Sequence, residues 1–150
     1  MAEISRVALF GKLDTTCYRA IESATVFCKL RGNPYVEIAH WIHQLLQLED
    51  SDLHRIVRHF NLDGARIARE VLEALDRLPR GASAVSDLSA HVMDAVEQAW
   101  LYGSLLYNQQ RIRSAHLMLG MLRSSNLKNV LSGVSREFVR LPPDVLSEDI

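Results

Sequence analysis

Cysteine is scarce in this sequence of 150 residues, which contains only Cys17 and Cys28. Both belong to one predicted helix, where eleven residues at 1.5 Å per residue separate them by about 16 Å, too far for a disulfide. A chain without a disulfide framework is typical of a reducing compartment. Lysine is scarce as well, because only three of the seventeen basic side chains are lysines and the rest are scattered arginines.

An excess of charge of one sign and a long apolar run are also missing. The seventeen basic and eighteen acidic residues give a net charge of −1, which predicts binding to neither nucleic acid nor a membrane surface. No apolar stretch reaches the ~18 residues of a membrane-spanning helix, and the N-terminus lacks a signal-peptide pattern. We therefore expect a soluble, cytoplasmic protein.

What the sequence does contain is an internal repeat. The stretch Ala20–Leu46 returns in weaker form between Ala95 and Leu122. Ala20 aligns with Ala95 in the first halves of the two copies, and His40 aligns with His116 in the second halves. The second copy therefore carries one inserted residue between its halves. Two units of this length are too few for a solenoid, and they indicate a duplicated, fused domain.

Apolar residues recur with the helical period along the chain, and no strand-like alternation appears. We predict an all-α protein with pseudo-twofold symmetry and about eight helices in one compact domain. The predicted helices cover about residues 14–31, 36–48, 50–59, 63–78, 88–107, 113–123 and 127–131, with a short segment before and after them. The second and sixth of these are apolar nearly all round, which predicts that they are buried.

Domain boundaries follow from the repeat and from composition. The domain is predicted to span residues 1–141, with a first repeat of about 14–78 and a second of about 88–140. Residues 142–150 contain Pro142-Pro143 and an acidic end, and we interpret them as the start of a linker.

Histidines are the first candidates for chemistry. His40 and His43 lie three residues apart on a predicted helix, and Glu37 lies three residues before His40, a spacing that suits metal ligands on one face. The pattern H-E-x-x-H is absent, however, and His40 recurs as His116 in the second copy. We interpret His40 as a core histidine that bonds a backbone or carboxylate group. A metal- or ligand-binding helical enzyme centred on His40 and His43 is the alternative.

Other local motifs of catalysis are absent. Glu22 and Glu97 occupy equivalent places among alanines, which favours hydrogen bonding on or between helices over acid–base work. Gly11-Lys12 is no phosphate loop, because no glycine stands five residues earlier and Leu13 replaces the required Ser or Thr. We predict no catalytic residue, no cofactor and no metal, so this chain is not expected to be an enzyme.

At this level of detail the sequence resembles a known family, the N-terminal double-repeat domain of Clp-type AAA+ unfoldases. The resemblance rests on the A-x-E-x-A cores (Ala20 to Ala24, Ala95 to Ala99) and on the wording FGKL, ATVFCKLRGNPYVEIAHW and NLD, which look most like the ClpV branch of type VI secretion. The chain departs from the family at Ile38-Ala39-His40, where many relatives have Thr-Glu-His.

The resemblance implies a recognition domain. It would bind a short amphipathic helix of a contractile-sheath subunit or a sheath-associated protein in an apolar groove, and so bring contracted sheath to the ATPase ring for disassembly. The parent would be a hexameric, ATP-hydrolysing unfoldase whose ATP and magnesium belong to ATPase domains outside this chain, while the isolated domain is expected to be a monomer. The alternative is a domain that docks adaptors or unfolded clients in a protease-linked Clp chaperone.

The duplicated core buries its central helices, so we expect the partner to contact surface that is added to the repeat or lies at its junction. The predicted groove consists of Ile4, Val7, Phe10, Leu13, Val85, Leu88 and Val92.

Overall fold

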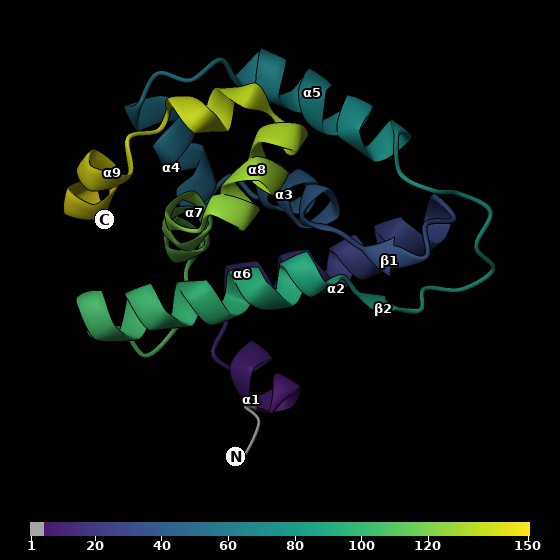
Figure 1. Ribbon diagram of the computed structural model, residues 1–150, viewed down its shortest axis with the longest axis horizontal. Coiled ribbons are helices and arrows are strands. Elements are labelled where there is room, and N and C mark those ends of the chain that lie inside the picture. The colour runs from purple at the N-terminus through teal and green to yellow at the C-terminus, as the bar shows by residue number, and fades with distance from the viewer. Residues whose placement is uncertain (1–4) are drawn as a thin grey trace.

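The computed structural model describes residues 5–150, and in this part of the chain nearly all ordered elements are helical (Figure 1). In chain order they are α1 (Arg6–Phe10), α2 (Thr15–Leu30), β1 (Tyr35–Val36), α3 (Ile38–Gln47), α4 (Asp52–His59), α5 (Gly64–Asp76), β2 (Asp87–Leu88), α6 (Ala90–Leu101), the π-helical turn η1 (Tyr102–Leu106), α7 (Ser114–Arg123), α8 (Ser125–Val134), the 3₁₀ turn η2 (Arg136–Arg140) and α9 (Pro143–Asp149). The predicted all-α class is confirmed.

The two copies of the repeat begin their long helices in the same way. Asp14 accepts the backbone N–H of Cys17 at the start of α2 (2.8 Å), and Ser89 accepts that of Val92 at the start of α6 (3.3 Å). Such caps satisfy one of the four N–H groups that a helix leaves without a partner at its N-terminus. Asp14 and Ser89 occupy equivalent positions in the two copies, so the repeat extends to the capping position.

Two parallel backbone pairings join the copies and make the pseudo-twofold symmetry visible. In β1 and β2, Val36 pairs with Leu88, and in an isolated bridge Leu13 pairs with Ile112. Leu13 corresponds to Leu88 and Val36 to Ile112 in the repeat, so each pairing is the symmetric counterpart of the other. Each copy therefore supplies one chain segment to each of the two pairings.

The buried helices α3 and α7 lie at the centre of the molecule, as their all-round apolar pattern predicts. Helix α2 packs on α3, and α6 packs in the same way on α7 (Figure 1). Every residue of α7 from Ser114 to Leu122 is buried. The core is thus continuous across both copies.

The residue inserted between the halves of the second copy lies in the stretch between Ala99 and Ile112, which contains η1. A π-helical turn closes its hydrogen bonds over one more residue than an α-helical turn, and therefore accommodates one extra residue within a helix. Gly103 lies in this turn, and a Cβ there would be only 3.0 Å from Nδ1 of His116. The turn thus lets the end of α6 approach α7 closely.

The C-terminal segment differs from the prediction of a linker. Residues from Pro143 form α9, because a proline is well suited to the first turn of a helix, and Leu146 is only 1% exposed. The hydroxyl of Tyr107 donates to the carbonyl of Ser147, and Arg123 pairs with Asp144 at 2.7 Å. The folded domain therefore extends beyond residue 141.

Candidate functional site

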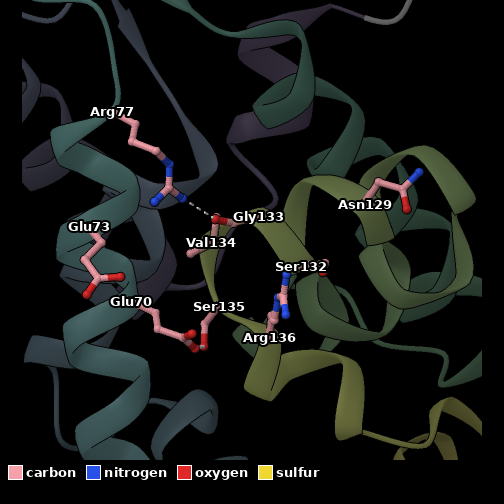
Figure 2. Close-up of a pocket in the computed structure, with 9 residues that line it drawn as sticks. All are labelled: Glu70, Glu73, Arg77, Asn129, Ser132, Gly133, Val134, Ser135 and Arg136. Carbon is pink, nitrogen blue, oxygen red and sulfur yellow. Dashed lines mark hydrogen bonds between the residues drawn. The ribbon is translucent and has the colours of Figure 1, made fainter.

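A polar cavity of about 480 Å³ lies between α5 and the end of α8 (Figure 2). Two of its charged side chains have hydrogen-bond partners within the lining: the Ser135 hydroxyl donates to Glu70 at 2.8 Å, and Arg77 donates to the carbonyl of Gly133 at 3.0 Å. The hydrogen bond from Ser135 lowers the pKa of Glu70, which keeps this carboxylate ionised. These contacts connect α5 and the residue after it to the C-terminal end of α8, and we interpret them as structural.

An apolar groove of about 390 Å³ lies where α1, α2 and the two strands meet. It is lined by Phe10, Tyr18, Ile21, Glu22, Thr25, Val36, Val85, Asp87 and Leu88. Its floor is fully hydrophobic, with Ile21 5% exposed and Val36 0% exposed. Its walls keep apolar surface open to solvent, because Tyr18 is 46% exposed and Leu88 is half-buried.

Three of the residues predicted for the partner groove, Phe10, Val85 and Leu88, line this cavity. Leu13 and Val92 do not, because the bridge to Ile112 holds Leu13 in the interior and Val92 is completely buried in α6. The structure corrects the prediction for these two.

The other two predicted groove residues have separate outcomes. Val7 is 82% exposed on α1 but does not line the groove. Ile4 lies outside the described residues.

The groove contains a face of α2 that the sequence prediction missed. Tyr18, Ile21 and Thr25 follow one another at helical spacings of three and four residues, so they lie on one side of the helix. This spacing is visible in the sequence, but Tyr18 and Thr25 carry hydroxyl groups and do not stand out as an apolar stripe.

An ion pair holds α1 beside β2 at the rim of the groove. Nη1 of Arg6 lies 2.6 Å from Oδ1 of Asp87, and the backbone N–H of Leu88 donates to the same oxygen at 2.7 Å. The hydrogen bond from Arg6 lowers the pKa of Asp87. Glu22 is a second, exposed carboxylate at the rim.

The histidines are bound within the core. Nδ1 of His40 accepts the backbone N–H of Glu37 at 2.8 Å, and its Nε2 lies 2.9 Å from the side-chain oxygen of Asn33. Burial lowers the pKa of His40 to about 4, so the ring is neutral at pH 7. His43 instead stacks on Phe27 with ring centroids 4.7 Å apart. The interpretation of His40 as a core histidine is confirmed.

Metal ligands do not gather in the described part of the chain. Within residues 5–150, no three His, Cys, Asp or Glu side chains come together as a metal site would require. None of the described helices has the length and apolar character needed to cross a membrane.

Comparison with known proteins gives a consistent family. The model of the Clp repeat (R) N-terminal domain matches residues 12–134. The chain is 57% identical over 148 residues to the AAA+ ATPase ClpV1 of Pseudomonas aeruginosa and 49% identical over 146 residues to a protein of Yersinia enterocolitica named chaperone protein ClpB. The two matches span 99% and 97% of this chain but only 16% of the length of each relative.

Solved structures agree with this fold. One, from work on the coevolution of the ATPase ClpV, the TssB-TssC sheath and the accessory HsiE protein, is 56% identical with a TM-score of 0.96, and the match covers 99% of this chain and 92% of that one. The N-terminal domain of the ClpV1 ATPase from enteroaggregative Escherichia coli is 27% identical with a TM-score of 0.76, covering 91% and 87%. A structure named for a peptide from the SciI protein of the same secretion system is 26% identical with a TM-score of 0.78, covering 90% and 94%.

Proposed function

This chain belongs to the family of Clp repeat (R) N-terminal domains, and we propose that it is the partner-docking domain of a type VI secretion ATPase of the ClpV kind. Its groove takes a short amphipathic helix from a contractile-sheath subunit or a sheath-associated protein. Docking brings contracted sheath to the ATPase ring for disassembly.

The observation that carries this proposal is the open apolar groove between α1, α2 and β2. A helix that enters such a groove buries one face through anchors spaced three or four residues apart. The similarity to a ClpV1 ATPase at 57% identity supports a sheath-related partner. So does the likeness, at 26% identity, to a structure that is named for a peptide of a type VI secretion protein.

The energetics require several anchors. A micromolar complex needs about 8 kcal/mol of net binding free energy, and apolar surface contributes roughly 25 cal/mol for each Å² buried. Ordering of a flexible peptide opposes binding by at least about 2–5 kcal/mol. The partner must therefore bury more than about 400 Å² of apolar surface in total, which a single exposed leucine does not supply. Tyr18, Val85 and Leu88 are the partly exposed apolar side chains of the groove that would contribute to this area.

The other properties follow from the same proposal. The domain acts in the cytoplasm, binds no cofactor and performs no catalysis. ATP and magnesium are bound by ATPase domains of a longer, hexameric parent, while the isolated domain is a monomer. Neither nucleic acid nor membrane is a partner, in keeping with the net charge of −1.

The test is a fluorescence-anisotropy titration of the domain with labelled N-terminal helices of sheath and sheath-associated proteins. Tyr18→Asp and Leu88→Asp introduce a charge into the groove and are expected to weaken binding at least about tenfold. Leu30→Asp is the matched control, because Leu30 is 80% exposed on α2 and does not line the groove. Circular dichroism checks that helicity is unchanged. Equal affinity of all three variants would refute the groove assignment.

A second function is suggested by the 49% identity to a protein named chaperone ClpB. In that case the domain docks unfolded clients or adaptors, and polar contacts dominate. An unfolded model substrate distinguishes the two functions, because a sheath-docking domain binds the amphipathic helix and leaves that substrate unbound.

A further inference from the structure

The internal repeat provides a reference for the groove, because the face of α2 that lines it has a counterpart on α6. In the alignment of the two copies, Tyr18, Ile21 and Glu22 correspond to Met93, Val96 and Glu97. These pairs preserve bulk or charge. The next position on this face differs greatly in side-chain size, since Thr25 on α2 corresponds to Trp100 on α6.

In the second repeat the chain itself fills the space beside Trp100. The indole is half-buried, and the ammonium group of Lys12 lies 5.3 Å from the centroid of its ring. Such a contact between a cation and an aromatic ring is attractive. Helix α1 packs against α6, just below it in Figure 1. On the α2 side Lys12 is replaced by Asp87, its counterpart in the repeat.

The segments before the two long helices differ in the same direction. Leu9 and Phe10 of α1 are buried, at 4% and 9% exposure. Their counterparts are the smaller residues Ala84 and Val85, which lie in an irregular segment where Ala84 is exposed and Val85 half-buried. The first repeat therefore lacks both the indole and the helix that cover the equivalent face in the second.

We propose, building on the sheath-helix function above, that the groove is the unfilled counterpart of the site occupied by Trp100 and Lys12. The partner helix supplies what the first repeat lacks: a bulky aromatic or leucine side chain that packs over Thr25, with a lysine or arginine next to it. The cation faces Glu22 and Asp87 at the rim, so Thr25 is the residue that determines which anchor fits.

Charge supports this occupant. Glu22 is exposed at the rim, and Asp87 pairs with the side chain of Arg6, which is 50% accessible, so this ion pair is itself partly open to solvent. A helix that brings a positive charge next to its anchor adds an attraction that an acidic helix lacks. This contribution is screened by salt because the groups are exposed.

The experiment fills the space from the protein side. Thr25→Trp places an indole where the second repeat has one, and it is expected to weaken the sheath-derived helix at least roughly tenfold by occupying the anchor position. Val26→Trp is the matched control: Val26 is the next residue, is 60% exposed and does not line the groove. It is expected to leave the affinity within about twofold.

A reciprocal change in the peptide gives a readout that simple damage to the fold does not produce. Each aromatic residue or leucine of the helix is replaced in turn by alanine. At one position, the alanine peptide is expected to bind the wild-type domain more weakly than the original peptide does. The same alanine peptide is expected to bind the Thr25→Trp domain more tightly than the original peptide does. Glu22→Lys additionally weakens binding at low salt, and this effect shrinks as salt is added.

Two failures are distinguishable. If the wild-type domain binds no sheath or accessory helix, the proposed function is wrong. If it binds one but Thr25→Trp leaves the affinity unchanged, or weakens every peptide equally without the exchange of preference, the anchor assignment is wrong and the docking function stands.

Discussion

His40 and His116 perform the same task in the two repeats. Nδ1 of each ring accepts the backbone N–H of the residue three positions earlier, at 2.8 Å from Glu37 and at 3.0 Å from Arg113. Both rings are completely buried. The histidine is thus a capping residue at the start of each central helix, and its repetition reflects the symmetry of the core.

This arrangement predicts that acid destabilises the fold. Burial lowers the pKa of His40 to about 4 and also lowers those of His43 and His116. In the unfolded chain these rings take up protons below about pH 6.5, so there the unfolded state binds more protons than the native state. The free energy of unfolding is therefore full above pH 6.5 and falls as the pH drops towards 4, by up to about 3 kcal/mol for His40.

Urea denaturation between pH 7.5 and pH 4 measures this loss. The variant His59→Gln is the control, because His59 is exposed and pairs with Asp149 on the surface. It should keep the same downward trend. A free energy of unfolding that does not change between pH 7 and pH 5 would contradict the interpretation of His40.

The close approach at η1 predicts the effect of a single methyl group. Gly103→Ala would place a Cβ 3.0 Å from Nδ1 of His116, and overpacking of this kind costs about 1–3 kcal/mol. Gly133→Ala is the matched helical control: no atom lies within 4 Å of its Cβ position, and alanine is expected to stabilise the helix by up to about 1 kcal/mol. Thermal unfolding should shift in opposite directions for the two variants. A shift of the same sign and size in both variants would show that the π-helical turn can accommodate the added methyl group without overpacking.

Features of the fold could be predicted from the sequence where they depend on residues close together in the chain or on the internal repeat. The repeat, the buried helices and the role of His40 follow from periodicity and from comparison of the two copies, both of which are visible in the chain. The burial of Leu13 was not, because it depends on the pairing of Leu13 with Ile112, which is distant in the chain. Val92 is buried on the same face of α6 as Ala95, Val96 and Ala99, and this helical spacing is present in the sequence.

Two other features differ from the prediction, the C-terminal helix α9 and the groove-lining face of α2. In both cases the sequence pattern allows two interpretations. Pro142-Pro143 is typical of a linker, but a proline also suits the first turn of a helix. On α2, the spacing of Tyr18 and Thr25 is helical, but their hydroxyl groups conceal the face that lines the groove.

Helix α9 predicts a contrast between neighbouring residues. Leu146 is 1% exposed and Val145 is 45% exposed. Leu146→Ala is expected to lower the free energy of unfolding by about 2–4 kcal/mol, because it removes buried apolar volume. Val145→Ala should change it by less than about 0.5 kcal/mol. Chemical denaturation of both variants measures the difference, and equal values would mean that residues 142–149 do behave as a linker in solution.

The last prediction concerns the contact between the repeats at Asp52 and Arg113. Two charge-assisted hydrogen bonds join them, from Nε of Arg113 to Oδ2 at 2.8 Å and from Nη2 to Oδ1 at 2.7 Å. The side chain of Asp52 is 9% exposed and that of Arg113 is 39% exposed. Solvent therefore screens part of the pair, and Asp52→Ala should cost about 2 kcal/mol, below the roughly 3–5 kcal/mol of a fully buried pair.

Asp76→Ala is the control for this pair. Asp76 contacts two arginines, as Asp52 contacts Arg113 and Arg55, but the side chain of Asp76 is 63% exposed. Its loss is expected to cost less than about 1 kcal/mol. Restoring neutrality with the double variant Asp52→Ala/Arg113→Met should recover part of the stability, since part of the cost of Asp52→Ala comes from leaving Arg113 without its partner. If the double variant is instead less stable than Asp52→Ala, Arg113 contributes to the junction through packing of its aliphatic stem, independently of Asp52.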